Sequence, residues 1–173
     1  SIAHIPARRR EQLIDLLRPD EETLAREDQQ ARYALKSIDG LRLPRRMGVK
    51  PSWEKQRWLE PHRVVVLEIP VRHLKIRQLA ITRNDPTRTS DLERRGKIVD
   101  EAIVPTRFHA TVLVHDTLEQ LHEWRFQAGT DQVVQGYTQA WIADSTTPKT
   151  HLRTSAALIA KNHHGSRRRP VGA

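Results

Sequence analysis

The apolar positions near the start of the chain recur at helical spacing. Residues 6–18 carry a broad apolar face, which predicts a helix that stops before Pro19. A second helix is predicted from Asp20 to Gly40, because acidic residues suit the positive start of a helix and glycine suits its end. We expect these two helices to form an N-terminal helical arm, residues 1–40.

In the middle of the chain the pattern changes to that of strands. A β-branched run over residues 64–69 predicts a buried strand, and residues 74–82 predict a second strand after a turn at 70–73. The sequence Ser-Asp-Leu-Glu from Ser90 has the form of a capping box. It predicts a helix that ends before Pro105.

The second half of the chain predicts further elements of both kinds. Alternating apolar residues predict a strand over 108–115. A possible capping box at Asp116 opens a helix that ends at Gly129, and apolar residues between 134 and 141 mark a last long helix. A short helix is predicted over 156–160.

These elements together predict an α+β protein. We expect a core domain over residues 62–145, in which a small, mostly antiparallel sheet packs with two or three helices. The N-terminal helical arm precedes it. Residues 41–61, which contain several prolines and two tryptophans but no periodicity, are predicted to be a basic extended connector. Residues 146–173 are predicted to be a basic C-terminal tail.

The charge of the chain indicates a binding partner. The 173 residues include 30 Lys and Arg against 21 Asp and Glu, which gives a net charge of +9 with histidine neutral. Such an excess repels itself in a compact fold, so we expect a polyanionic partner, and nucleic acid (DNA or RNA) is the first candidate. The excess is concentrated in the connector and in the tail, which has no acidic residue from Ser145 onwards.

Candidate contacts with nucleic acid follow from these two segments. Lys and Arg neutralise phosphates, and indole rings can stack on unpaired bases. In and beside the connector we predict contacts by Arg42, Arg45, Arg46, Lys50, Trp53, Lys55, Arg57, Trp58 and Arg63. In the tail we predict contacts by Lys161, Arg167, Arg168 and Arg169. The alternative is that both tryptophans fasten the connector to the domain by packing while the charges face water.

Two other interpretations involve particular motifs. Residues 117–143 have the outline of a helix-turn-helix, with Gln132, Gln135 and Gln139 able to reach adenine edges, although Arg125 is the one cation there. Residues 108–112, Phe-His-Ala-Thr-Val, resemble one half of the His-x-Thr pair of the two-histidine phosphoesterases. That resemblance implies a strand and a catalytic role for His109, but the segments at His73 and His151 lack the Ser or Thr that a second half needs.

Several classes of site are not expected. The chain has no cysteine, which excludes disulfides, thiolate catalysis and Cys-based zinc sites. The glycines stand singly, so no phosphate loop is formed. The histidines lack the spacing of metal ligands; His109 and His115 on one strand would lie about 20 Å apart. We therefore expect no metal and no cofactor. No apolar run approaches the roughly 20 residues of a membrane span.

The resulting hypothesis is a non-enzymatic nucleic-acid-binding subunit that makes mainly phosphate contacts. It would be cytoplasmic or lie within a nucleic-acid-containing particle. The alternative is a structural subunit of a large assembly, such as a virion or a ribonucleoprotein particle, held by contacts with protein partners or with its own copies. A phosphoesterase that uses His109 is the third hypothesis.

Overall fold

The computed structural model describes Arg8 and residues 18–71, 74–127 and 139–164 of the chain. Within these ranges the chain forms helices, two short 3-10 turns and five strands. In chain order they are α2 (Glu21–Leu41), the 3-10 turn η1 (Pro44–Arg46), α3 (Pro51–Lys55), β1 (His62–Val71), β2 (Leu74–Arg83), α4 (Pro86–Glu93), β3 (Lys97–Val104), α5 (Arg107–Gln120), the 3-10 turn η2 (His122–Trp124), β4 (Arg125–Phe126), β5 (Ala140–Ile142) and α6 (Leu152–His164).

The five strands form one antiparallel sheet in the order β3-β1-β2-β5-β4. Strands β1 and β2 form the predicted hairpin, in which His62 lies opposite Arg83 and Leu67 lies opposite Gln78. The chain then crosses through α4 to reach β3 on the other side of β1. This arrangement confirms the predicted α+β class and the mostly antiparallel sheet.

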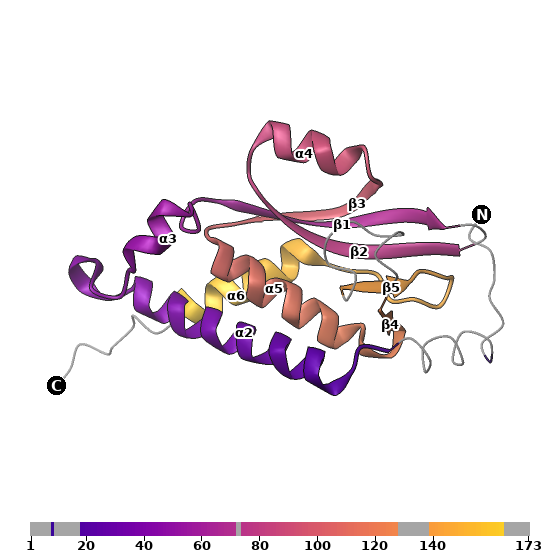
Figure 1. Ribbon diagram of the computed structural model, residues 1–173, viewed down its shortest axis with the longest axis horizontal. Coiled ribbons are helices and arrows are strands. Elements are labelled where there is room, and N and C mark those ends of the chain that lie inside the picture. The colour runs from indigo at the N-terminus through magenta and orange to yellow at the C-terminus, as the bar shows by residue number, and fades with distance from the viewer. Residues whose placement is uncertain (1–7, 9–17, 72–73, 128–138, 165–173) are drawn as a thin grey trace.

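Helices cover both faces of the sheet. Helices α2, α5 and α6 lie on one face and α4 lies on the other (Figure 1). Val64 and Val66 of β1 belong to the main core with α5, whereas Val65 and Leu67 pack with Leu92 of α4. Because β1 is buried on both sides, its sequence is a continuous apolar run rather than an alternating one.

Helix α2 is part of this core. It begins after Asp20, whose carboxylate accepts a hydrogen bond of 2.8 Å from the backbone N–H of Thr23. Its buried residues Ala31, Ala34 and Ile38 face the core, and α2 packs along α5. The described helix of the predicted arm therefore belongs with the α+β core. The other predicted helix of the arm, over 6–18, lies outside the described residues apart from its Arg8 and Arg18.

The prediction of an extended connector is wrong. The connector contains η1 and α3, and it folds back on the end of α2, where Gly40 and Gly48 touch through their backbones. A Cβ on Gly48 would overlap the carbonyl oxygen of Gly40. The approach is possible because neither residue has a side chain, and it shapes the connector into a compact loop.

The helix predicted from Ser90 to Pro105 is wrong. Asp85 caps α4 by accepting a hydrogen bond from the Thr87 N–H, and Pro86 takes the first helical position, so Ser90 lies inside a helix that is already under way. Residues 97–104 form β3, which pairs with β1. The capping-box pattern was matched by chance within α4.

The strand predicted over residues 108–115 is also wrong, because this segment lies in α5. Thr106 caps the helix, and its hydroxyl oxygen lies 3.4 Å from the backbone nitrogen of His109. Helix α5 lies between the sheet, α2 and α6, so residues on nearly every side of it are buried. A helix buried all round loses the apolar stripe by which a helix is recognised in a sequence.

The helix-turn-helix outline and the last long helix are wrong as well. Residues 125–126 and 140–142 are the paired strands β4 and β5, and Trp141 is fully buried in β5. Gln132 and Gln135 lie outside the described residues, whereas the Gln139 carbonyl accepts a hydrogen bond from Leu79 of β2. The helix predicted over 156–160 is confirmed as the centre of α6, which starts where Asp100 of β3 accepts hydrogen bonds from Thr150 and Leu152.

No helix within the described ranges combines the length and the apolarity that crossing a bilayer requires.

A buried ion pair joins α2 to the far edge of the sheet. The Arg125 guanidinium lies 2.8 Å from the Glu27 carboxylate, and both side chains are largely buried. Removing one partner leaves the other charge buried without its counter-charge, which lowers the free energy of unfolding.

We predict that Glu27→Ala lowers the free energy of unfolding by about 3 kcal/mol. The matched control is Glu22→Ala, since Glu22 pairs with Arg26 on the exposed side of the same helix and its loss should cost less than about 1 kcal/mol. Urea unfolding followed by circular dichroism measures both. Equal losses for the two variants would show that the buried pair contributes nothing particular.

Candidate nucleic-acid interface

Four aromatic rings form a cluster at the N-terminal end of α5. The ring of Phe108 lies edge-on to Trp53 at 4.7 Å between centroids, to Trp58 at 6.0 Å and to Tyr33 at 6.3 Å. The chain has four Trp, two Tyr and two Phe residues, so half of its aromatic side chains are in this cluster. Edge-to-face pairs of this kind are favourable beyond their burial. The cluster fastens the connector to α2 and α5.

The cluster decides between the two roles proposed for the tryptophans. Trp53 is 4% exposed, so its ring is not available to a base, and the packing interpretation holds for it. Trp58 is half-buried, and one face of its ring is covered by the Arg107 guanidinium at 5.6 Å. Both tryptophans therefore fix the shape of the loop that carries the charges.

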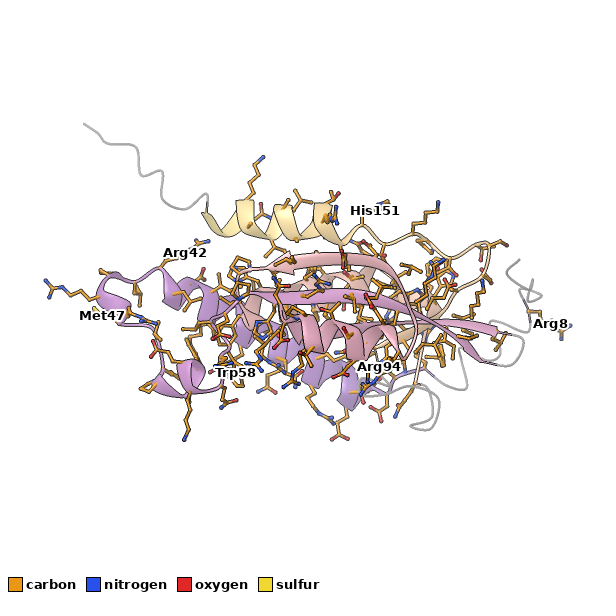
Figure 2. The ribbon with its side chains drawn as sticks, turned by 90° about the horizontal axis from the view of Figure 1, so that it is seen from above. Arg8, Arg42, Met47, Trp58, Arg94 and His151 are labelled. Atoms are coloured by element: carbon orange, nitrogen blue, oxygen red, sulfur yellow. The ribbon has the colours of Figure 1, made fainter. Side chains whose placement is uncertain are left out.

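Most of the predicted cations of the connector are exposed on one protruding loop, residues 42–60, which we call the basic loop. It forms one end of the molecule, marked by Arg42 and Met47 in Figure 2. Five side chains of the loop are exposed cations, namely Arg45, Arg46, Lys50, Lys55 and Arg57.

Carboxylates compensate only some of these charges. Arg46 pairs with Glu54, and Arg57 lies 3.7 Å from Glu60. Among the residues that the structure describes, no carboxylate lies within 4.0 Å of Arg45 or Lys55. The basic loop therefore keeps a net positive charge.

Three arginines of the basic loop have left-handed backbone conformations. The φ angles are 55° at Arg45, 57° at Arg46 and 59° at Arg57. In this region a residue with a Cβ costs roughly 1–2 kcal/mol relative to its usual conformations, and glycine avoids that cost. The fold thus carries strain at three positions where the side chain is an exposed guanidinium.

The remaining predicted contacts are placed differently. Arg42 is half-buried, and one of its terminal nitrogens is buried without a hydrogen-bond partner. Arg63 is half-buried in β1 and lies 3.4 Å from Glu101, so it is less available than the loop cations. Lys161 is exposed on α6, which ends on the same side of the molecule as the basic loop (Figures 1 and 2). Arg167, Arg168 and Arg169 lie outside the described residues.

A groove that the sequence did not suggest runs between α2 and α5 beside the aromatic cluster. It is open to solvent and encloses about 520 Å³. Its lining residues come from α2, from α5 and from the turn after α3, namely Arg26, Gln29, Gln30, Tyr33, Ala34, Trp58, Arg107, Phe108 and Thr111. Arg107 was not predicted as a site residue, because residues 108–115 were predicted to be a strand and the start of α5 was not recognised. The sequence signal that could have indicated this groove is a set of polar and aromatic residues at helical spacing in α2, namely Arg26, Gln29, Gln30 and Tyr33.

The potential at the Arg107 end of the groove is positive. Arg107 occupies the first helical position of α5, whose first turn contains no acidic residue, and no carboxylate of the described ranges lies within 4.0 Å of it. The buried His62 lies nearby and donates from Nδ1 to the Glu60 carbonyl at 2.7 Å. Burial lowers the pKa of His62, and the charges of Arg107 and Arg83 lower it further.

The Tyr33 hydroxyl is also beside a cation. Lys50 Nζ lies 3.4 Å from the hydroxyl oxygen. Partial burial tends to raise the pKa of Tyr33, but hydrogen bonds with Lys50 and Trp53, together with the charge of Lys50, outweigh it and bring this pKa below its usual value. The charge of Lys50 thus adds to the positive potential at the rim of the groove.

His109 does not have the surroundings that the phosphoesterase resemblance implies. It lies in a helix instead of a strand, it is 8% exposed, and its Nδ1 is 2.7 Å from the Thr106 hydroxyl. The strand geometry of the His-x-Thr motif is therefore wrong for this chain. Within the described ranges, no three His, Asp or Glu side chains are grouped so that they could hold a metal ion.

We predict that the protein loses stability as the pH falls below 6.5, the ordinary pKa of histidine. The folded state depresses the pKa of His62, so the unfolded chain binds a proton first and is favoured by acid. His62→Asn retains a side-chain N–H and removes the titration, so its stability should depend less on pH in this window. Urea midpoints across the window measure this, with the exposed His122→Asn as control. Parallel curves for wild type and His62→Asn would contradict the assignment.

Comparisons with protein-family models, with curated proteins and with solved structures gave no match. The case for a function therefore comes from the charges, rings and groove described above.

Proposed function

We propose that this protein is a non-enzymatic nucleic-acid-binding subunit that contacts phosphates through the basic loop. The observation that carries the proposal is the set of five exposed cations on one protruding loop, of which Arg45 and Lys55 have no carboxylate nearby among the described residues. Concentrated Lys and Arg side chains bind a phosphate backbone by charge and by release of its counterions. Such contacts are weakly specific for sequence.

The conformation of the loop supports the same proposal. Arg45 and Arg57 occupy left-handed positions that glycine would fill with less strain. Strain of this kind is retained at functional sites when the side chain is needed there. A planar guanidinium suits that use, because it binds phosphate oxygens through two parallel hydrogen bonds.

The position of the loop also favours a large anionic partner. The aromatic cluster holds the loop against the core, so its cations are presented on a fixed framework. Helix α6 ends towards the same end of the molecule (Figure 1), and the exposed Lys161 in its last turn adds a positive charge. A framework that orders cations in advance reduces the entropy lost when they bind.

We predict that the double variant Arg45→Ala/Lys55→Ala weakens binding to both DNA and RNA by about tenfold at low salt and makes the affinity less dependent on salt. Two lost phosphate contacts should reduce the slope of log K against log salt by about two on duplex DNA. Fluorescence anisotropy at several salt concentrations measures both quantities. The control is Arg94→Ala, an exposed arginine at the end of α4. No binding by the wild type at low salt, or an affinity insensitive to salt, would sink the proposal.

We predict that Arg45→Gly weakens nucleic-acid binding severalfold and raises the free energy of unfolding by up to about 1 kcal/mol, because glycine relieves the left-handed strain. Lys55→Gly is the matched control, since it removes one cation from α3 and should lower stability by about 1 kcal/mol. Thermal unfolding and anisotropy are measured on the same samples. A loss of stability in Arg45→Gly would show that the left-handed conformation carries no strain.

The alternative role, a structural subunit of a large assembly, is favoured by the edge strand β3. This eight-residue strand ends the sheet and exposes the apolar side chains of Val99 and Ile103. Unpaired strand edges can pair with another chain. Light scattering without nucleic acid distinguishes the two roles: self-assembly of the pure protein favours the structural role, and a monomer favours the first.

A further inference from the structure

We infer that the groove between α2 and α5 holds an unpaired nucleotide of a bound strand, so that the protein prefers single-stranded nucleic acid to duplex. This inference rests on the proposed function and assigns a site for it beside the basic loop, which contributes Trp58 to the groove. It depends on the shape of the groove, on the presentation of Arg107 and Arg26, and on the exposed ring of Tyr33.

The groove has the size and the mixture of groups that a nucleotide needs. Its volume of about 520 Å³ lies within the range of small-molecule sites. Two arginines, two glutamine amides and three aromatic rings share its walls. Phosphate, base edge and base face are the three parts of a nucleotide that such groups recognise.

Arg107 is held ready for a phosphate. Its guanidinium lies over the Trp58 ring at 5.6 Å, and its backbone N–H donates to the Trp58 carbonyl at 2.8 Å. This cation–π contact favours one position of the guanidinium, whose N–H donors can bind an anion. Because no described carboxylate lies within 4.0 Å, the charge of Arg107 is available to an incoming phosphate.

Arg26 supplies a second cation to the same groove. It is exposed and only loosely paired, with Glu22 at 3.7 Å on the preceding turn of α2. Seven residues of helix separate Arg26 from Tyr33, which is about 10 Å along the helix axis. The groove thus presents cations from two elements with an aromatic ring beside them.

Tyr33 offers a platform for a base. The residue is 45% exposed, and its ring makes an edge-to-face contact with Phe108. Lys50 holds the hydroxyl from the rim, so the ring is oriented before any ligand arrives. Every base has a face that can stack on such a ring, and the contact is tolerant of sequence.

The amides explain the preference for an unpaired strand. Gln29 and Gln30 are exposed on the wall between Arg26 and Tyr33. An amide can donate to and accept from a base edge. In a duplex the Watson–Crick edges are already paired and the base faces are stacked, so neither the amides nor Tyr33 could use them.

The test compares a short single strand with a duplex of the same length. The full chain is titrated at low salt with oligothymidine, with the thymidine–adenine duplex, and with a strand that contains 2-aminopurine, whose fluorescence is quenched by stacking. We expect the wild type to bind the single strand about tenfold more tightly than the duplex and to quench 2-aminopurine. Tyr33→Leu and Arg107→Ala should each weaken single-strand binding by about tenfold and change duplex binding by less than twofold.

Conservative variants separate a binding role from a structural one. Tyr33→Phe retains the ring and should keep the quenching, whereas Tyr33→Leu should lose it. Arg107→Lys retains the charge without the forked guanidinium and should fall between wild type and Arg107→Ala. Arg94→Ala is the matched control away from the groove, and the melting temperature of each variant reports whether it is folded.

The outcomes distinguish this inference from the proposed function. Equal affinity for single strand and duplex, with groove variants that bind like the wild type, would overturn the inference and leave the role of the basic loop intact. Absence of binding to either nucleic acid would overturn the proposed function and this inference together. Loss of single-strand binding in Tyr33→Leu with retention in Tyr33→Phe would support the inference.

Discussion

The arrangement of this protein depends on the contact of Phe108 with three other aromatic rings. Trp53 and Trp58 come from the loop before the sheet, Tyr33 comes from α2, and Phe108 comes from α5. In a chain with few aromatic residues, one cluster joins three segments that are distant in sequence. The position of the basic loop, the cation–π contact of Arg107 with Trp58 and one wall of the groove all follow from it.

The fold class could be predicted because β-branched patterning over β1 and β2 is strong. The errors in α5 and β3 have different causes. Helix α5 has no apolar stripe, since the sheet and two helices surround it, and its alternating residues look like a strand. Strand β3 contains Asp100 and Glu101 and follows a capping-box pattern, so local propensity favoured a helix there. Pairing with β1 overrode that propensity.

Part of the candidate site could also be predicted from the sequence, and part could not. The cations of the basic loop could be predicted, because composition alone locates charge. Their fixed presentation could not, since it depends on which of Trp53 and Trp58 is buried. The groove could not be predicted either, because Tyr33 and Arg107 are brought together by the packing of α2 on α5. Contacts between distant segments carry no local pattern.

The ion pair between Glu27 and Arg125 spans 98 residues of chain. Helix α2 is made before α5, the helix against which it packs, so that partner is absent until α5 has left the ribosome. Contacts between residues so far apart in sequence slow folding, because the chain between them loses conformational entropy before the contacts can form. During synthesis the apolar face of α2 is therefore exposed and is a potential binding site for a chaperone. The basic loop is the segment that must reverse the direction of the chain before α2 can be buried.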